Sequence, residues 1–235
     1  MSRSFTEPDI DQVKALLRAM VGRRVVVVGD MMLDAYLMGR ISRISPEAPV
    51  PVFEIQSHQF TLGGAANVAK CLVALGAKVT VCGVLGADAD ADLVRAEARS
   101  LEINTAGLVA DASRPTTLKS RVVARHQQLM RLDREAHRPI TPAVIRRLVQ
   151  RIEKAVARAE AVVLSDYGKG VLTPAVCRAA IRSAAGPPAN SRTRANQAPS
   201  KPVVVDPKGL PWACYRGATM IKPNEREASA FGGQT

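Results

Sequence analysis

The run Gly63-Gly64-Ala65-Ala66-Asn67 has the residue types of a segment that holds a polyol at the start of a helix. Glycines before a helix let a ligand approach the backbone closely, and the first turn of a helix presents unpaired N–H groups. The amide of Asn67 can both donate to and accept from sugar hydroxyls. Taken alone, the glycine pair is better explained as a plain tight turn, so the surrounding sequence has to decide.

Acidic residues follow three apolar runs that are typical of buried strands. Asp30 comes soon after four valines, Asp206 ends a second run, and Asp166 follows a third. Ligands of open α/β sheets bind at the carboxyl ends of the strands, which favours a binding role for Asp30 and Asp206. The alternatives stay open, because Asp30 and Asp206 could cap strand ends, Asp166 could bond loop amides, and Asp34 could be a helix N-cap.

An α/β fold is needed to position these groups. Apolar residues make up 47% of the 235 residues and aromatic residues only 3%, so the core must consist of Val, Leu, Ile and Ala. Such a core suits helices packed on a buried, mostly parallel sheet. Periodicity and Thr-Pro helix starts predict helices at 9–20, 65–75, 88–100, 141–159, 173–184 and from 224, and strands at 25–28, 78–84, 161–164, 203–206 and 218–221.

Two segments depart from this alternation, and we expect them to form a small β lid of antiparallel strands. The first, 36–60, contains three prolines and a short strand at 52–55. The second, 107–132, includes a stretch in which polar and apolar residues alternate. The region 186–201 is rich in Pro, Asn, Ser and Arg, and we expect a flexible surface insertion there.

Charge and cysteine content restrict the partners. The net charge is +12, which favours anionic ligands, although a solvated basic surface explains most of it. No basic run is interleaved with aromatic residues, so we disfavour nucleic acid. No stretch reaches the roughly 18 apolar residues of a membrane span, and residues 1–10 contain no apolar run, so we expect a cytoplasmic protein with no membrane contact. We expect free, buried thiols at Cys71, Cys82, Cys177 and Cys214.

With Gly76 and Gly86, the glycine-rich run resembles the first signature of the PfkB family of ribokinase-like sugar kinases. The resemblance implies an α/β three-layer sandwich with a mostly parallel sheet and a small β-sheet lid. It also implies substrate contacts along the chain. The implied substrate-binding residues are Asp30, Asp34, Gly63, Gly64, Asn67 and Asp166, with the lid cations Arg43, Lys119 and Arg131. Which basic residue near the lid holds a substrate phosphate stays open, because Arg114 and Arg121 are also candidates.

Two later segments resemble the nucleotide side of the same family. Asp206-Pro207-Lys208-Gly209 is similar to the family's DPKG stretch, and residues 222–227 contain its N-x-x-E motif. In the family this motif organises Mg²⁺ near the phosphates of ATP, and a hard cation that keeps its waters suits an Asn and Glu pair. The implied nucleotide-binding residues are Lys208, Asn224, Glu225, Arg226 and Glu227, with Glu227 as the metal ligand.

The stretch 42–51 resembles the lid of the heptose 7-phosphate kinases of lipopolysaccharide precursor synthesis, and 127–133 and 165–167 agree with it. The implied reaction is ATP-dependent phosphorylation of D-glycero-D-manno-heptose 7-phosphate at its anomeric hydroxyl, which gives the 1,7-bisphosphate. The alternatives are another sugar kinase of this family, or a non-catalytic module that binds sugar phosphates or nucleic acid. We also expect a homodimer that pairs through the lid.

The family's catalytic base lies in a Gly-Ala-Gly-Asp segment whose backbone N–H groups form an anion hole. The 235 residues contain no such segment, and no acid follows Gly232-Gly233. We therefore expect residues 1–235 to be an incomplete, C-terminally truncated kinase domain with negligible turnover, and we assign no catalytic residue.

Overall fold

The computed structural model describes residues 9–125, 127–186 and 200–232, which form a main sheet and a separate lid sheet. The main sheet is parallel and has the strand order β10-β9-β8-β1-β4-β5. Its strands are β1 (Arg24–Gly29), β4 (Lys78–Leu85), β5 (Asn104–Ala110), β8 (Ala161–Ser165), β9 (Val203–Asp206) and β10 (Met220–Ile221).

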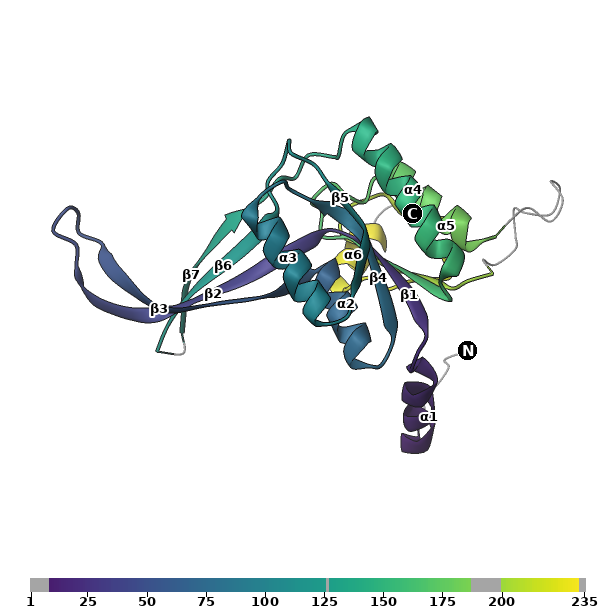
Figure 1. Cartoon of the computed structure of the whole chain (residues 1–235), viewed down its shortest axis with the longest axis horizontal. Helices are drawn as coiled ribbons and strands as arrows, with labels where there is room; N and C mark the ends of the chain where they lie inside the picture. The colour runs from purple at the N-terminus through teal and green to yellow at the C-terminus, as the bar shows by residue number, and fades with distance from the viewer. Residues whose placement is uncertain (1–8, 126, 187–199, 233–235) are drawn as a thin grey trace.

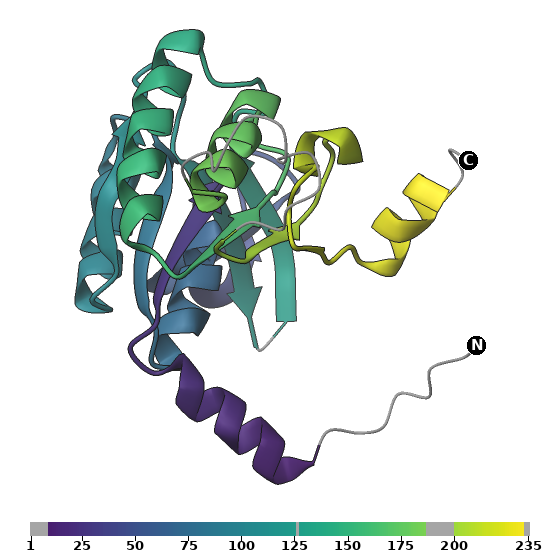
Figure 2. The same ribbon diagram turned by 90° about the vertical axis from the view of Figure 1, so that its right-hand side faces the viewer.

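Helices cover both faces of the main sheet (Figure 1). The helices are α1 (Ile10–Met20), α2 (Ala65–Ala74), α3 (Ala89–Ser100), α4 (Pro142–Arg158), α5 (Pro174–Ala184) and α6 (Glu225–Gly232), with a 3₁₀ turn at Trp212–Tyr215. The helices α2 and α3 pack on one face, and α4 and α5 pack on the other. This confirms the predicted three-layer sandwich. Helix α1 lies outside the layers and buries none of its residues (Figure 2).

The four valines of β1 show why this strand lies in the centre. Val25 and Val27 belong to the core under α2 and α3, whereas Val26 and Val28 belong to the core under α4 and α5. Successive side chains of a strand point to opposite faces, so a strand covered on both faces has to be apolar throughout. The valine run therefore requires neighbours on both sides, and β4 and β8 supply them.

The Thr-Pro pairs begin the two helices on the second face, as predicted. The hydroxyls of Thr141 and Thr173 accept hydrogen bonds from the amides of Val144 and Val176, and a proline follows each threonine. These caps satisfy amides that the first turn leaves unpaired. Each helix therefore begins where its sequence indicates and can place its buried stripe on the sheet.

The lid sheet has the order β3-β2-β6-β7, and its strands are β2 (Met31–Ile44), β3 (Pro51–Gly64), β6 (Thr117–Ala124) and β7 (Gln127–Arg134). The hairpin β2–β3 extends far beyond the main sheet (Figure 1). The pairs β2–β3 and β6–β7 are antiparallel as predicted, but β2 and β6 run parallel. A long excursion through the main sheet separates β2 from β6, which permits the parallel pairing.

The predicted lid boundaries need three corrections. The first segment spans 31–64 rather than 36–60, because the chain re-enters extended structure directly after Asp30. Asp34 therefore lies inside a strand, and its interpretation as a helix cap is wrong. The second segment is 117–134 rather than 107–132, since the strand at 104–110 pairs with β4 as an edge of the main sheet. The burial of β5 does not alternate, because Gly107, Leu108 and Val109 are all buried, and its residues alone do not indicate which sheet it joins.

Other expectations concern local details. Cys82 and Cys177 are buried, and burial raises the pKa of each thiol to about 12. Cys71 is exposed on α2, so its predicted burial is wrong, and Cys214 is partly exposed. Most of the predicted insertion at 186–201 lies outside the described residues. No helix in the described ranges is long and apolar enough to cross a bilayer.

Candidate functional site

The carboxyl end of β1 leads into Asp30, whose carboxylate organises the loop that follows β8. Only 1% of Asp30 is exposed. One carboxylate oxygen accepts the amides of Tyr167 (2.8 Å) and Lys169 (3.2 Å), and the other accepts the amide of Val171 (3.1 Å). Burial raises the pKa of Asp30, and the three backbone N–H groups oppose that rise. This geometry is that of a loop anchor, and direct substrate binding by Asp30 stays a prediction.

Asp166 has the same kind of environment. Its carboxylate accepts the amide of Gly168 at 2.8 Å and the hydroxyl of Tyr215 at 3.1 Å, and the residue is 5% exposed. Burial raises the pKa of Tyr215, and the neighbouring Asp166 carboxylate adds to the rise. Asp166 therefore bonds a loop amide, as one of its two interpretations from the sequence proposed. A contact between Asp166 and the substrate stays a prediction.

The glycine pair joins the lid to α2 directly over Asp30. Gly64 has φ +56° and ψ −135°, which an L side chain rarely adopts, and a Cβ there would lie 2.5 Å from the Asp30 carbonyl oxygen. That carbonyl accepts the amide of Ala65 at 3.0 Å. The helix begins without a side-chain cap, and Asn67 is exposed in its first turn. The two motifs that stood 33 residues apart, at 30 and 63, are thus in contact.

Strand register sorts the lid side chains into two faces. Asp34 pairs with Thr61 on β3 and with Lys119 on β6, and Tyr36 pairs with Arg121. Paired residues of neighbouring strands share a face of the sheet. The polar face of the lid comprises Asp34, Tyr36, Thr61, Lys119, Arg121, Arg131 and Asp133. The opposite, apolar face comprises Leu33, Ala35, Leu37, Phe60, Val122, Met130 and Leu132.

Asp34 and Arg121 form the ion pair at the centre of the polar face. The carboxylate of Asp34 lies 2.6 Å from the Arg121 guanidinium, which also stands 5.3 Å above the Tyr36 ring. The hydrogen bond that Arg121 donates to the Asp34 carboxylate raises the pKa of Arg121. Both side chains are about one-fifth exposed, at 20% and 22%. An acceptor and a cation therefore stand side by side within reach of a ligand, which suits a molecule carrying hydroxyls and an anionic group.

Glu135 connects the lid to the loop after β8, and sequence reasoning missed it. Its carboxylate lies 3.1 Å from the Lys119 ammonium and 2.7 Å from that of Lys169. Burial alone would raise the pKa of Glu135, but hydrogen bonds from Lys169 and Lys119 outweigh it and lower the pKa. Glu135 belongs to no recognised motif, so only the folded arrangement identifies it.

The predicted lid cations differ in their surroundings. Lys119 is bound by Glu135 and Asp133, and Arg131 makes two hydrogen bonds to Asp133, at 2.8 and 3.0 Å. Arg43 is exposed close to the hairpin tip, nine residues along β2 from Asp34, which is about 30 Å of extended strand. The structure therefore brings Lys119 and Arg131 to the polar face with Asp34 but leaves Arg43 far from them within one chain.

Arg114, a further lid candidate, is buried and serves the loops. Its guanidinium donates to the carbonyls of Lys169 (3.0 Å) and Arg138, and it lies 3.6 Å from the Asp111 carboxylate. Desolvation lowers the pKa of Arg114, and the nearby Asp111 and Asp30 oppose that shift. The Arg114 side chain therefore connects the segments that contain Asp111, Arg138 and Lys169.

The N-x-x-E segment forms a reciprocal cap at the start of α6. The side chain of Asn224 accepts the Glu227 amide at 2.8 Å, and the Glu227 carboxylate accepts the Asn224 amide at 2.9 Å. This is a capping box, which pairs two otherwise orphaned donors. The other Glu227 oxygen lies 3.4 Å from the Lys208 ammonium, whereas Glu225 and Arg226 are exposed. The cap fixes one carboxylate at the helix start.

No group of three or more His, Cys, Asp or Glu side chains that could hold a metal ion occurs among the described residues. A single carboxylate such as that of Glu227 nevertheless fits Mg²⁺, because this ion keeps several waters and takes its remaining ligands from substrate phosphates. The N-x-x-E residues are therefore chemically compatible with a magnesium–nucleotide complex, and their role in it stays a prediction.

Comparison with known proteins identifies relatives over nearly the whole chain. Residues 23–235 match the pfkB family carbohydrate kinase. The bifunctional protein HldE of Desulfatibacillum aliphaticivorans is 44% identical over 212 residues, which are 89% of this chain and 40% of that protein. The HldE of Caulobacter vibrioides is 44% identical over 223 residues, 95% of this chain and 43% of that protein. The chain thus spans about two-fifths of the length of these curated relatives.

Solved structures share the fold at low sequence identity. A ribokinase of Arabidopsis thaliana, in complex with ribose and ATP, superposes with a TM-score of 0.59 at 19% identity and covers 91% of this chain and 64% of that chain. Phosphofructokinase-2 of Escherichia coli superposes with a TM-score of 0.63 at 16% identity, with coverage of 91% and 64%. These likenesses confirm the predicted ribokinase-like fold.

Proposed function

The chain belongs to the pfkB family of carbohydrate kinases, and from that premise we propose that it binds D-glycero-D-manno-heptose 7-phosphate for phosphorylation by ATP at the anomeric hydroxyl. The product is the 1,7-bisphosphate, a precursor for the heptose of lipopolysaccharide. The observation that carries the proposal is the Asp34–Arg121 pair, which sets a hydroxyl acceptor beside a cation on the polar face of the lid. The resemblance of 42–51 to heptose 7-phosphate kinases supports this choice of sugar.

The sugar hydroxyls bind to Asp34 and Asn67. Asp34 supplies carboxylate lone pairs, and the exposed amide of Asn67 supplies both a donor and an acceptor. Gly63 and Gly64 are buried, and their missing side chains leave room for the Asp34 carboxylate and the Asp30 carbonyl. Asp30 and Asp166 contribute by holding the loop at 166–171 in one conformation, because their carboxylates bond its amides.

The substrate phosphate binds to the cations of the polar face, and Arg121 is the first choice. A guanidinium can hold a phosphate through two parallel hydrogen bonds, and Arg121 is already oriented by Asp34 and Tyr36. Lys119 lies on the same face as a second cation. Asp133 engages both Lys119 and Arg131, and Glu135 also engages Lys119, so both contribute less than Arg121.

Arg43 reaches a sugar only if a second copy contributes it. We propose that two chains pair through their lids, since Met130 and Leu132 on the apolar face are each 53% exposed. Such pairing covers apolar surface and carries each hairpin tip across to the partner. Sedimentation velocity tests this, because a monomer at micromolar concentration contradicts it.

ATP and Mg²⁺ bind on the side of α6. Lys208 and Arg226 would supply positive charge for the phosphates of ATP, Asn224 and Glu225 would lie beside them at the start of α6, and Glu227 would hold Mg²⁺ through its waters. When bound, Mg²⁺ neutralises charge on the phosphates. No residue of this chain is assigned as catalytic base, since the 235 residues contain no Gly-Ala-Gly-Asp segment. We therefore propose that this chain alone binds the sugar and turns over negligibly.

A substrate panel tests the assignment. The chain is titrated by calorimetry with heptose 7-phosphate, fructose 6-phosphate and ribose, and a longer protein that carries this chain followed by a Gly-Ala-Gly-Asp segment is assayed for ADP release with the same sugars. We expect heptose 7-phosphate to bind best and to give the highest kcat/KM. Preference for fructose 6-phosphate contradicts the choice of sugar, and robust turnover by the 235-residue chain contradicts the proposed lack of a base.

A further inference from the structure

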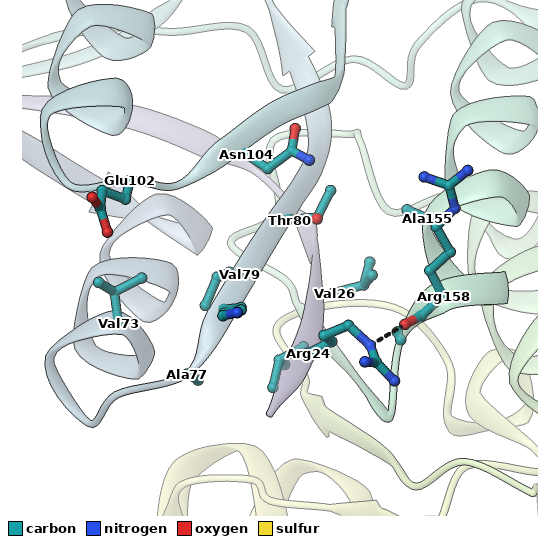
Figure 3. Close-up of a pocket in the computed structure, with 13 residues that line it drawn as sticks. Arg24, Val26, Val73, Ala77, Val79, Thr80, Glu102, Asn104, Ala155 and Arg158 are labelled. Atoms are coloured by element: carbon teal, nitrogen blue, oxygen red, sulfur yellow. Dashed lines mark hydrogen bonds between the residues drawn. The ribbon is translucent and has the colours of Figure 1, made fainter. Parts of the chain in front are cut away.

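A groove opens at the amino-terminal edge of the main sheet, where β1, β4 and β5 begin and α4 ends (Figure 3). It consists of two neighbouring cavities, of about 410 and about 560 Å³, which share the lining residues Thr80, Asn104, Ala155 and Arg158. Volumes of this size are typical of small-molecule sites. We call it the amino-edge groove.

The amino-edge groove lies at the other end of the strands from the proposed sugar site. Arg24 and Lys78, which line it, begin β1 and β4, whereas Asp30 and Gly86 come directly after those strands end. Strands of six to eight residues separate the two regions by about 20 to 25 Å. The groove is therefore independent of the sugar and of its phosphorylation.

One wall of the groove carries a row of cations on α4. Arg151, Lys154 and Arg158 line it and follow each other at intervals of three and four residues, so they project from one side of the helix. The row extends about 10 Å, because an α-helix rises about 1.5 Å per residue. That length matches a ligand with two or more phosphate groups better than a single small anion.

A second pair of cations, Arg24 and Lys78, stands at the strand starts, and Glu102 is the acid among the residues that line the two cavities. Figure 3 shows Glu102 across the groove from Arg158, beside Val73. The lining therefore holds five basic groups and one acid, and one of the five, Arg24, lies 3.6 Å from the carboxylate of Glu160 outside the lining. The other four account for part of the +12 net charge that the sugar site leaves unexplained.

Several of these cations are free to receive a ligand. Within the described ranges, the ammonium groups of Lys78 and Lys154 and the guanidinium of Arg158 have no acidic partner. Arg151 donates to the Ala106 carbonyl at 3.2 Å, which turns it toward edge strand β5. A solitary surface cation is usually just solvated, but cations that converge on one cavity reinforce each other.

The C-terminal end of a helix repels anions unless its carbonyls are engaged. Here the ammonium of Lys201 donates to the carbonyls of Val156 (2.6 Å) and Ala157 (3.0 Å), and Arg24 donates to that of Arg158 at 2.7 Å (Figure 3). Two cations therefore offset the negative end of α4 at the groove. This removes the main electrostatic objection to an anionic ligand.

The remaining lining supplies neutral donors and an apolar wall. Asn104 uses its carbonyl oxygen for the Ala106 amide at 2.9 Å. In the part of the chain that the structure describes, the Thr80 hydroxyl and the Asn104 NH₂ group have no hydrogen-bond partner, so both can bind a ligand. Val73, Ala77 and Val79 line the other side (Figure 3). We propose that the amino-edge groove binds a small organic molecule with two or more phosphate groups, held by Lys154 and Arg158 and packed against these apolar residues.

Binding is measured on the 235-residue chain with ADP, inorganic pyrophosphate and a single-stranded DNA oligomer as probes, by NMR of ¹⁵N-labelled protein in Mg²⁺-free buffer. We expect ADP and pyrophosphate to shift the amide signals of Thr80, Asn104 and Ala155 saturably, with ADP binding more tightly because of its apolar base. Shifts by ADP confined to residues near α6 contradict the proposal, since they report the nucleotide side instead.

The double variant Lys154→Glu/Arg158→Glu should weaken pyrophosphate binding at least 10-fold. Its matched control is Arg146→Glu/Arg178→Glu, which changes the net charge equally at exposed helix positions outside the groove and should change affinity less than twofold. Circular dichroism checks that both variants stay folded. Equal weakening by both variants, or no saturable shift with millimolar pyrophosphate, overturns the proposal. DNA that competes with pyrophosphate at equal phosphate concentration also overturns it, because it indicates a non-specific polyanion surface.

Discussion

Gly63 lies against the carboxylate of Asp34, with no room for a side chain between them. A Cβ on Gly63 would stand 2.6 Å from the Asp34 Oδ2 atom and 2.9 Å from its carboxyl carbon. Real Cβ atoms do not approach so closely, so the absent side chain is what allows Asp34 to face Arg121. The first glycine of the motif thus acts through the lid as well as through the helix start.

Gly63→Ala should displace the Asp34 carboxylate. We expect the free energy of unfolding to fall by about 1–3 kcal/mol, as in overpacked sites, and the affinity for heptose 7-phosphate to fall roughly 10-fold or more. Urea denaturation and calorimetry measure the two effects. Gly209→Ala is the stability control, because a Cβ there meets nothing within 4 Å, and it should stay within about 0.5 kcal/mol. Unchanged sugar affinity in Gly63→Ala contradicts the role of this contact.

Gly64→Ala should destabilise the protein for a different reason. Gly64 has φ +56°, and its Cβ would meet the Asp30 carbonyl oxygen at 2.5 Å, so backbone strain and a backbone clash combine to cost about 2–5 kcal/mol. Gly22 has φ +76° with nothing within 4 Å, and Gly22→Ala should cost only the strain, about 1–2 kcal/mol. Thermal or urea denaturation compares the two. Equal losses would show that the contact with Asp30 does not matter.

Asp34 and Arg121 should have separable effects on substrate choice. Asp34→Asn removes a charged hydroxyl acceptor and should weaken phosphorylated and unphosphorylated sugars alike. Arg121→Gln removes a phosphate-binding cation and should weaken heptose 7-phosphate about 10-fold while leaving unphosphorylated heptose within about twofold. Calorimetry measures both, and the exposed Arg146→Gln serves as the control. If Arg121→Gln weakens both sugars equally, Arg121 orients Asp34 and does not bind the phosphate.

Glu135 should give stability a specific pH dependence. Its folded-state pKa lies below the ordinary value of 4.5, so its contribution is present above pH 4.5 and is lost as pH falls through the lowered pKa. Glu135→Gln should therefore lower the free energy of unfolding by about 1–3 kcal/mol at pH 7, and by progressively less below pH 4.5. Urea denaturation from pH 7 to pH 3 follows the difference. Glu47→Gln at the exposed hairpin tip is the control. A difference in unfolding free energy between Glu135→Gln and the unsubstituted protein that stays constant down to pH 3 contradicts the lowered pKa of Glu135.

Glu227→Gln should separate the helix cap from the proposed magnesium site. Glutamine still accepts the Asn224 amide, so unfolding should change by no more than about 0.5 kcal/mol, whereas the affinity for Mg²⁺–ATP should fall at least about 10-fold. Glu227→Ala should lose both the helix cap, which lowers the free energy of unfolding, and the affinity for Mg²⁺–ATP. Calorimetry and circular dichroism measure the effects, with the exposed Glu153→Gln as control. Unchanged nucleotide affinity in Glu227→Gln would mean that the carboxylate serves only the cap.

Local pattern was enough to predict most elements of the main sheet. The valines of β1 have no polar position to offer solvent, so this strand has to be central. Thr141 and Thr173 cap the helices that their Thr-Pro pairs predict. These patterns depend only on residues close together in the sequence, so they predict strands and helices without knowledge of the fold. The pattern failed at 104–110, because the pairing of this strand with β4 is a tertiary contact that its own residues do not indicate.

The sequence by itself determined which chemical groups this protein possesses and the family signature that they form. Only the tertiary structure decided what each group touches. A carboxylate accepts any donor brought to it, and the register of distant strands set Asp34 beside Arg121, 87 residues away, while Asp30 received the amides of a loop 137 to 141 residues away. Long-range pairing also selected Glu135 and gathered the cations of the amino-edge groove. These relations depend on contacts between elements far apart in the chain, which no local spacing encodes.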